Sequence, residues 1–169
     1  FHEIAYPASE LQSEVTSNDL KILVPAHLQK YGEAQKDDIF AVMRAGLKFY
    51  NAYFNNFNVP KKLALVFCPR LTSDAMEYSG AIHLSDKYLY STRQKPTPAN
   101  MFSRANTILH HIAHLWFGNT VTMAWWSDLW LSESFATFMG YQALAELGAS
   151  FSYGDIESAT QFGVLKSLS

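Results

Sequence analysis

Two histidines and a glutamate are spaced in this sequence as the ligands of a metal ion would be. His110 and His114 stand four residues apart in the apolar stretch TILHHIAHLWF, and eighteen residues separate His114 from Glu133. On a helix, residues i and i+4 lie on one face, so both imidazoles can reach one ion. A catalytic zinc site commonly has three protein ligands and an open fourth position. The spacing predicts one Zn²⁺ on these three residues, although two ordinary half-buried histidines can also be spaced in this way.

The residue after His110 decides what such a site could catalyse. In the hydrolytic pattern H-E-x-x-H it is a glutamate that accepts a proton from the attacking water, and here it is His111. An imidazole can accept a proton, but its reach differs and its protonated form is repelled by Zn²⁺. Coordination by His111 would need distortion, because adjacent helix residues point about 100° apart. We therefore predict strongly impaired hydrolysis, since general acid–base catalysis typically contributes about 10²–10⁴ in rate.

The composition is that of a globular domain. The chain has 169 residues, of which 49% are hydrophobic and 15% aromatic, enough for one domain with a sizeable core. The formal net charge of −2, with interspersed signs, does not suggest a nucleic-acid surface. The single Cys68 excludes an internal disulfide framework. No apolar run is long enough to span a bilayer, there is no signal-peptide pattern, and the start at Phe1 suggests a cut or processed chain.

The elements that would position the three ligands indicate an α+β fold, a small sheet packed by long helices. Strands are predicted at 20–25, 62–69 and 81–84, the last of them at a sheet edge. Helices are predicted at 37–54, 99–117 and 127–147. The two ligand histidines then lie on one helix, and Glu133 lies on the next helix packed against it.

Two motifs resemble the aminopeptidase N family. The stretch HHIAHLWFGNTVTMAWWSDLWLSESFATFMGY resembles its zinc signature, H-E-x-x-H followed after eighteen residues by E. Upstream, DAMEY (74–78) resembles its exopeptidase motif G-A-M-E-N, and Glu77 precedes His110 by 33 residues, as in the family. The resemblance implies a thermolysin-like, gluzincin zinc metallopeptidase catalytic domain, truncated at both ends. Residues 37–169 would be part of that domain, and residues 1–36 the end of a preceding β-domain.

The resemblance also implies how a substrate would be held. In the family, the glutamate of G-A-M-E-N binds the free α-amino group of a peptide, a role that falls here to Glu77 by charge pairing. The backbone of Ala75 and Met76 would hold the peptide by strand-like hydrogen bonds. The implied partners are peptide or protein N-termini, together with the N- and C-terminal domains of the family that this sequence lacks.

The sequence departs from the family at further positions. Asp74 and Tyr78 replace glycine and asparagine of the exopeptidase motif, which affects the expected shape of the substrate pocket. The family supplies an oxyanion-stabilising tyrosine well downstream of its glutamate ligand, and Tyr141 and Tyr153 come too soon to match it. We expect that donor to be absent, and removing such a donor can lower turnover about 10²–10³-fold.

Several aromatic residues lie near the proposed ligands in the sequence. So many aromatic residues close together are more typical of a hydrophobic core than of a pocket. They are Trp116, Phe117, Trp125, Trp126 and Trp130. Asp128 could accept a hydrogen bond that orients a ligand histidine, or it could cap the following helix.

Three interpretations stay open. The first is a zinc aminopeptidase-like domain with impaired hydrolysis, either a natural pseudoenzyme or a deliberately inactivated protein. The second is a non-catalytic peptide-binding or scaffold module that keeps the fold. The third is a redesigned metal site in which His111 takes part in coordination. Neither the preferred N-terminal residue, the compartment nor the oligomeric state is indicated by the sequence.

Overall fold

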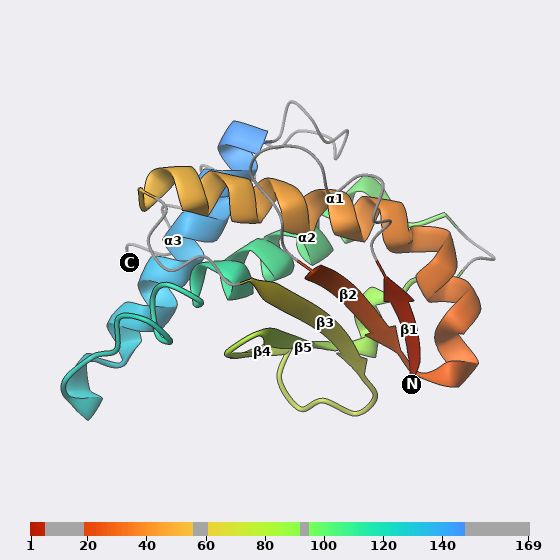
Figure 1. Ribbon diagram of the computed structural model, residues 1–169, viewed down its shortest axis with the longest axis horizontal. Coiled ribbons are helices and arrows are strands. Elements are labelled where there is room, and N and C mark those ends of the chain that lie inside the picture. Colours follow the sequence, from red (N-terminus) through yellow and green to blue (C-terminus); the bar gives the residue numbers. More distant parts are fainter. Residues whose placement is uncertain (6–18, 56–60, 92–94, 148–169) are drawn as a thin grey trace.

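A five-stranded mixed sheet with helices packed on it makes up the structure, a computed structural model that describes residues 1–5, 19–55, 61–91 and 95–147. The strands are β1 (His2–Ala5), β2 (Asp19–Val24), β3 (Lys62–Cys68), β4 (Ala75–Tyr78) and β5 (Ala81–Ser85). The long helices are α1 (Gln29–Tyr53), α2 (Pro98–Ala113) and α3 (Trp130–Leu147). Helices α1 and α2 lie against the sheet (Figure 1). The predicted α+β class is confirmed.

The strand order β1-β2-β3-β5-β4 places β4 at one edge of the sheet. The three central strands β2, β3 and β5 are parallel, and β1 and β4 run antiparallel to their neighbours. The edge predicted at 81–84 was therefore wrong, because this segment is β5 and is paired on both sides. The edge strand is the short β4, joined to β5 by a turn at Gly80, whose φ is 81°. Its pairing sets Glu77 opposite Ile82.

Helix α1 begins two turns earlier than predicted, at Gln29 rather than Asp37. Gly32 makes this segment unlike a helix in sequence, yet the glycine is needed for close packing. A Cβ on Gly32 would lie 2.9 Å from a side-chain carbon of Val24 in β2. Helix α1 continues through residue 36 without a break, and β2, which precedes it in the chain, pairs with β3, which follows it. Among the described residues, the segments before and after residue 36 therefore share one sheet and one helix. A domain boundary at residue 36 stays a prediction.

The buried stripe of α1 includes a residue that makes hydrogen bonds to both other long helices. The stripe consists of fully buried apolar residues with helical spacing, Ile39, Met43, Leu47 and Tyr50. The hydroxyl of Tyr50 lies 3.0 Å from the carbonyl oxygen of Leu109 in α2 and 3.1 Å from that of Met139 in α3. A buried hydroxyl needs such a partner, since leaving it without one would cost free energy. Tyr50 therefore helps to set the position of α2 relative to α3.

Helix α2 is capped at its start and ends earlier than predicted. Thr97 and Asn100 form a reciprocal capping box. The helix ends at Ala113 with His114 as its C-cap, whereas residue 117 was the predicted end. Beyond it the chain folds back, with the amide of Val121 donating to the carbonyl of Trp116 at 2.8 Å. Gly118 makes this turn possible at a φ of 118°.

A close approach between α2 and α3 brings the proposed ligands together. A Cβ on Gly140 would lie 3.3 Å from both Cα and N of His110, so only glycine allows this spacing without displacement of a backbone. Helix α3 begins at Trp130, after a 3₁₀ turn at Trp126–Asp128, and not at residue 127 as predicted. Glu133 consequently lies in the first turn of α3.

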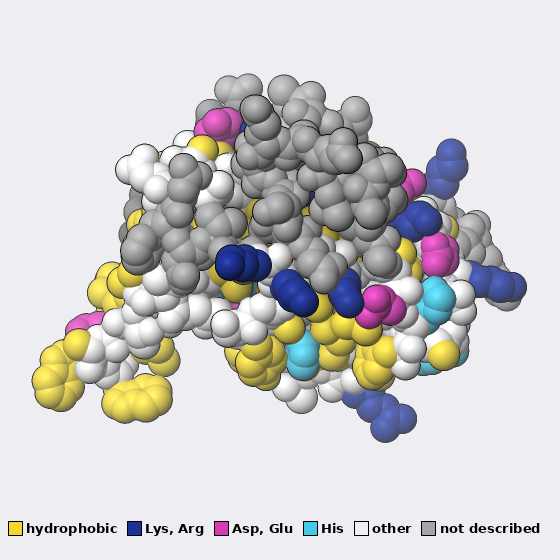
Figure 2. All heavy atoms as spheres, in the orientation of Figure 1, with side chains coloured by type: hydrophobic (Ala, Val, Ile, Leu, Met, Phe, Trp, Pro, Cys, Tyr) yellow, Lys and Arg dark blue, Asp and Glu magenta, His cyan; other side chains and the backbone are white. Residues whose placement is uncertain are grey.

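The prediction that the aromatic residues form core was right for Trp116 and wrong for three other tryptophans. Trp116 is buried, whereas Trp125, Trp126 and Trp130 are 74%, 88% and 62% exposed. They lie where the start of α3 projects beyond the rest of the fold, and apolar side chains are seen there (Figures 1 and 2). A surface hollow of about 350 Å³ along residues 122–129 is lined by none of the proposed metal ligands.

No helix among the described residues is both long and apolar enough to cross a membrane.

Candidate metal centre

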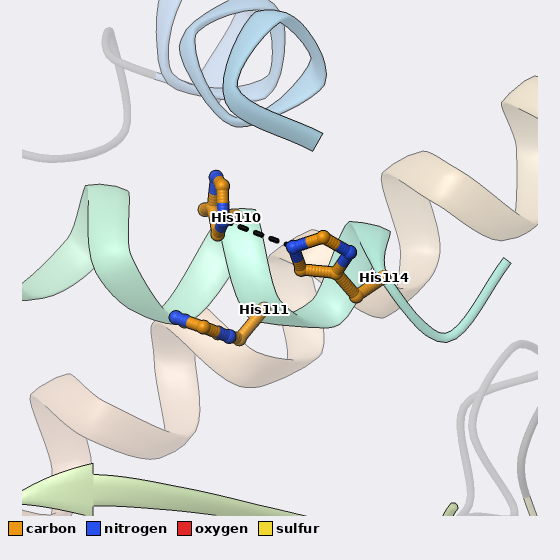
Figure 3. A group of neighbouring side chains, drawn as sticks. All are labelled: His110, His111 and His114. Carbon is orange, nitrogen blue, oxygen red and sulfur yellow. Dashed lines mark hydrogen bonds between the residues drawn. The ribbon is translucent and has the colours of Figure 1, made fainter. Parts of the chain in front are cut away.

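The three predicted ligands meet where α2 ends and α3 begins. The Nε2 atoms of His110 and His114 lie 3.0 Å apart. Oε2 of Glu133 lies 3.3 Å from Nε2 of His110 and 3.5 Å from Nε2 of His114. Figure 3 shows the rings of His110 and His114 turned toward one another, with His111 directed elsewhere. The chain thus forms a compact triangle of one oxygen and two nitrogen donors.

This triangle has the size that a zinc ion needs. Zinc binds imidazole nitrogen and carboxylate oxygen at about 2.0–2.2 Å in tetrahedral geometry, which sets neighbouring donors about 3.3–3.5 Å apart. The observed separations of 3.0–3.5 Å agree closely with that requirement. Two histidines with one carboxylate also form a donor set that zinc accepts in catalytic sites. The residues present therefore fit the ion.

The outer nitrogens of both histidines have partners that orient the rings. Nδ1 of His114 donates to the carbonyl oxygen of Phe117 at 2.9 Å, and Nδ1 of His110 lies 3.3 Å from the hydroxyl of Thr137. Because a carbonyl only accepts, the hydrogen of a neutral His114 is on Nδ1 and its Nε2 carries a lone pair. The short contact to Nε2 of His110 then requires a proton or a cation between the two nitrogens. A metal ion satisfies both lone pairs at once.

Metal binding requires deprotonated ligands, and the surroundings favour that form for Glu133 and His110 but not for His114. Hydrogen bonds from His110 and from His114 hold the pKa of Glu133 far below its usual range. Burial lowers the pKa of His110, so its neutral form is favoured. Burial also acts to lower the pKa of His114, but the hydrogen bond to Glu133 and the charge of Glu77 outweigh it and raise that pKa.

His111 makes its contact with Glu77 of β4. Its Nδ1 lies 2.9 Å from Oε2 of Glu77, and the two side chains are only 11% and 17% exposed. Burial alone would raise the pKa of Glu77, but the hydrogen bond from His111 and nearby histidine charge lower it, so the carboxylate is ionised. Donor atoms of Glu77, His114 and Glu133 all lie within 4.8 Å of one another, as do those of the three histidines. Glu77 thus lies beside the proposed metal ligands.

The two residues of the DAMEY stretch that differ from the family motif, Asp74 and Tyr78, have described contacts with residues other than Glu77. Asp74 accepts hydrogen bonds from Lys87 and from the hydroxyl of Tyr88, and these bonds lower the pKa of its carboxyl. Tyr78 is exposed and its ring packs on His83. Successive residues of a strand point to opposite faces, so the bulk of Tyr78 does not lie beside Glu77.

Residues that orient the ligands were only partly foreseen. Asp128 has a described hydrogen bond from Ser127, at 3.4 Å, and its role in orienting a ligand stays a prediction. The described contacts to Nδ1 of the ligand histidines come from the Phe117 carbonyl, from Thr137 and, at 3.4 Å, from the Ser132 hydroxyl. Thr137 could have been found from the sequence, because it follows Glu133 by four residues and so lies on the same helix face.

Gly118 supports the site, and replacing it with alanine is expected to weaken both fold and metal binding. A Cβ there would lie 2.9 Å from the Ser132 hydroxyl and 3.3 Å from Nδ1 of His114, at a φ of 118° that L-residues rarely adopt. We expect a loss of about 2–4 kcal/mol in the free energy of unfolding and a lower zinc affinity. Denaturant unfolding and chelator competition measure the two effects.

Gly80→Ala is the matched control for this substitution. Gly80 also has a positive φ, 81°, but among the described residues its Cβ would meet only the Lys62 carbonyl oxygen, at 3.7 Å. This variant should lose about 1–2 kcal/mol through backbone strain alone and keep its zinc affinity. If both variants bind zinc like the unmodified protein, the turn at Gly118 does not support His114.

Comparisons with known proteins point to one family. The family described as peptidase family M1 domain matches residues 40–167. Aminopeptidase N of Streptomyces lividans is 46% identical over 102 residues, covering 60% of this chain and 12% of that protein. Leucyl aminopeptidase of Saccharolobus solfataricus is 37% identical over 126 residues, covering 73% and 16%. Aminopeptidase M1-D of rice, Oryza sativa subsp. japonica, is 38% identical over 133 residues, covering 77% and 15%. The chain thus spans less than one-sixth of the length of these relatives.

Proposed function

Because the chain belongs to peptidase family M1, a family of zinc metallopeptidases, we propose that this metallo-aminopeptidase-like domain binds one Zn²⁺ and the amino termini of peptides or proteins. The proposed metal ligands are His110, His114 and Glu133, and the proposed amine ligand is Glu77. Hydrolytic removal of the first residue is the activity that such a site serves. We propose that it is strongly impaired here by His111.

The observation that carries the proposal is the donor triangle. Three donors predicted from spacing alone lie 3.0–3.5 Å apart, although they come from two helices. An ordinary ion pair needs only one imidazole beside the carboxylate, whereas here two imidazoles and the carboxylate converge at separations close to those that zinc coordination requires.

Peptide binding is supported by the position of β4. Its residue Glu77 presents an ionised carboxylate close to the donors of His114 and Glu133. Within the described part of the chain no strand pairs with the outer edge of β4, so the backbone at Ala75 and Met76 can receive an extended peptide. An amino terminus bound to Glu77 would then place its first peptide bond beside the metal ligands.

The proposal of impaired hydrolysis is supported by the residue type at position 111, because an imidazole differs in reach from a glutamate and its protonated form is repelled by Zn²⁺. When bound, zinc supplies Lewis-acid activation of a water molecule and of a carbonyl group. The chain must supply the group that accepts a proton. Nδ1 of His111 donates to Glu77, because an ionised carboxylate only accepts, and this leaves Nε2 as the sole ring atom that can receive a proton.

Metal content and amine selectivity test the proposal together. We expect one zinc per chain by mass spectrometry and no measurable cleavage of aminoacyl anilides. Glu77→Gln removes the negative charge and should weaken binding of a free-amine peptide about 10- to 100-fold, the range of one charge-assisted hydrogen bond. The N-acetylated peptide is the control and should bind both proteins equally. A chain that holds no zinc, or a variant with unchanged selectivity for the amine, would contradict the proposal.

A non-catalytic peptide-binding or scaffold module is the second candidate. The bond between His111 and Glu77 favours it, because it directs the imidazole at the base position toward β4 and leaves Nε2 as its one proton acceptor. This candidate predicts the same zinc content. It differs in predicting no hydrolysis even with glutamate at position 111.

A further inference from the structure

Glu77 already has a hydrogen-bond donor from within the protein. The imidazole of His111 lies 2.9 Å from Oε2, and both side chains are largely buried. The contact joins α2 to β4, elements that are independently fixed in place. Strand pairing sets Glu77 opposite Ile82, and His111 is a buried residue of α2.

The imidazole N–H resembles the group that Glu77 is proposed to bind. An amino terminus offers N–H donors to carboxylate oxygens, and His111 offers one N–H to one of the same oxygens. An incoming amine therefore either donates to a carboxylate whose Oε2 already accepts a hydrogen bond, or displaces the imidazole. An internal donor has the advantage of proximity, since a tethered group acts at an effective concentration of about millimolar or more.

We infer that His111 determines how tightly this site binds amino termini, by occupying Oε2 of Glu77 with its own N–H. The inference rests on the proposed function of Glu77. The imidazole acts as an internal competitor for the ligand amine. Replacing it with a side chain that has no donor should free Oε2 and strengthen binding.

Three substitutions separate the N–H from the other properties of the ring. His111→Ala removes the ring, and His111→Phe keeps a ring without a donor. His111→Gln keeps an N–H donor on an uncharged side chain. The ligand is a short peptide with a free amino terminus, and its N-acetylated form is the control. Dissociation constants are measured by calorimetry on zinc-loaded proteins, with the zinc content and unfolding temperature of each variant recorded.

The Ala and Phe variants should bind the free-amine peptide about 10- to 100-fold more tightly than the unmodified protein. The Gln variant should bind it about as tightly as the unmodified protein. The acetylated peptide should bind all of them equally, and adding Glu77→Gln should remove the gain.

If neither the Ala nor the Phe variant binds the free amine more tightly, while Glu77→Gln weakens it, His111 does not compete and the inference is overturned. If Glu77→Gln leaves amine selectivity unchanged in the otherwise unmodified protein, the proposed amine ligand is wrong, and the inference fails with it. If the Ala and Phe variants also bind the acetylated peptide more tightly, the gain in affinity comes from added space in the pocket and not from removal of the N–H. This result would likewise overturn the inference.

Discussion

Replacing His111 with glutamate is expected to raise hydrolysis of aminoacyl anilides by the zinc-loaded protein about 10²–10⁴-fold, the usual contribution of general acid–base catalysis. A carboxylate at this position can accept a proton through either oxygen. The native imidazole instead gives Nδ1 to Glu77 at 2.9 Å. The substitution also frees Glu77, so tighter substrate binding should accompany the faster reaction.

His111→Gln is the control for that experiment. Glutamine has the length and shape of glutamate and cannot accept a proton at neutral pH, so it should stay inactive. Initial rates are compared at equal zinc content, because a low rate caused by loss of zinc would otherwise be attributed to loss of the proton acceptor. Equal rates in the two variants would show that residue 111 is not the base. If neither variant cleaves while both hold one zinc, the non-catalytic module is the better description.

Replacing Glu133 with glutamine is expected to lower zinc affinity by more than about 100-fold. Partners that only orient a ligand contribute about 10- to 100-fold, and Glu133 supplies a donor atom and the negative charge of the triangle. Its side chain is 65% exposed, so the metal-free fold should tolerate the change. Competition with a chromophoric chelator measures the affinity.

Glu146→Gln is a control on the same helix, with the same loss of charge at an exposed position away from the triangle. Zinc should raise the unfolding temperature of this control as it does for the unmodified protein, because a ligand that binds only the folded state stabilises it. That rise should disappear in Glu133→Gln at the same zinc concentration. An unchanged rise would mean that another residue, such as Glu77, is the third ligand.

The ligand triangle could be predicted because its geometry is mostly local. His110 and His114 are linked by one helical turn, and the strong apolar pattern after residue 127 predicted the helix that carries Glu133. The central strand β3 was likewise evident from its apolar run. These features depend on neighbours in sequence, where side-chain periodicity carries the information.

The features that were missed depend on contacts distant in sequence. The first two turns of α1 were not predicted, and the glycine at position 32 within them is explained by the approach of Val24. The hydrogen bond between His111 and Glu77 joins residues 34 apart, and it requires knowing that β4 is an edge strand beside α2. Neither fact follows from local periodicity, since each is set by how the sheet is ordered.

The meeting of one helix end with another helix start has an electrostatic consequence of its own. Aligned peptide dipoles leave partial negative charge at the C-terminus of a helix and partial positive charge at the N-terminus. His110 and His114 stand at the end of α2, where a cation is favoured, and Glu133 stands in the first turn of α3, where an anion is favoured. The backbone itself thus attracts a positive ion toward the imidazoles and stabilises the charge on the carboxylate. Each such interaction contributes about 0.3–1 kcal/mol, and none of it depends on which side chain occupies position 111.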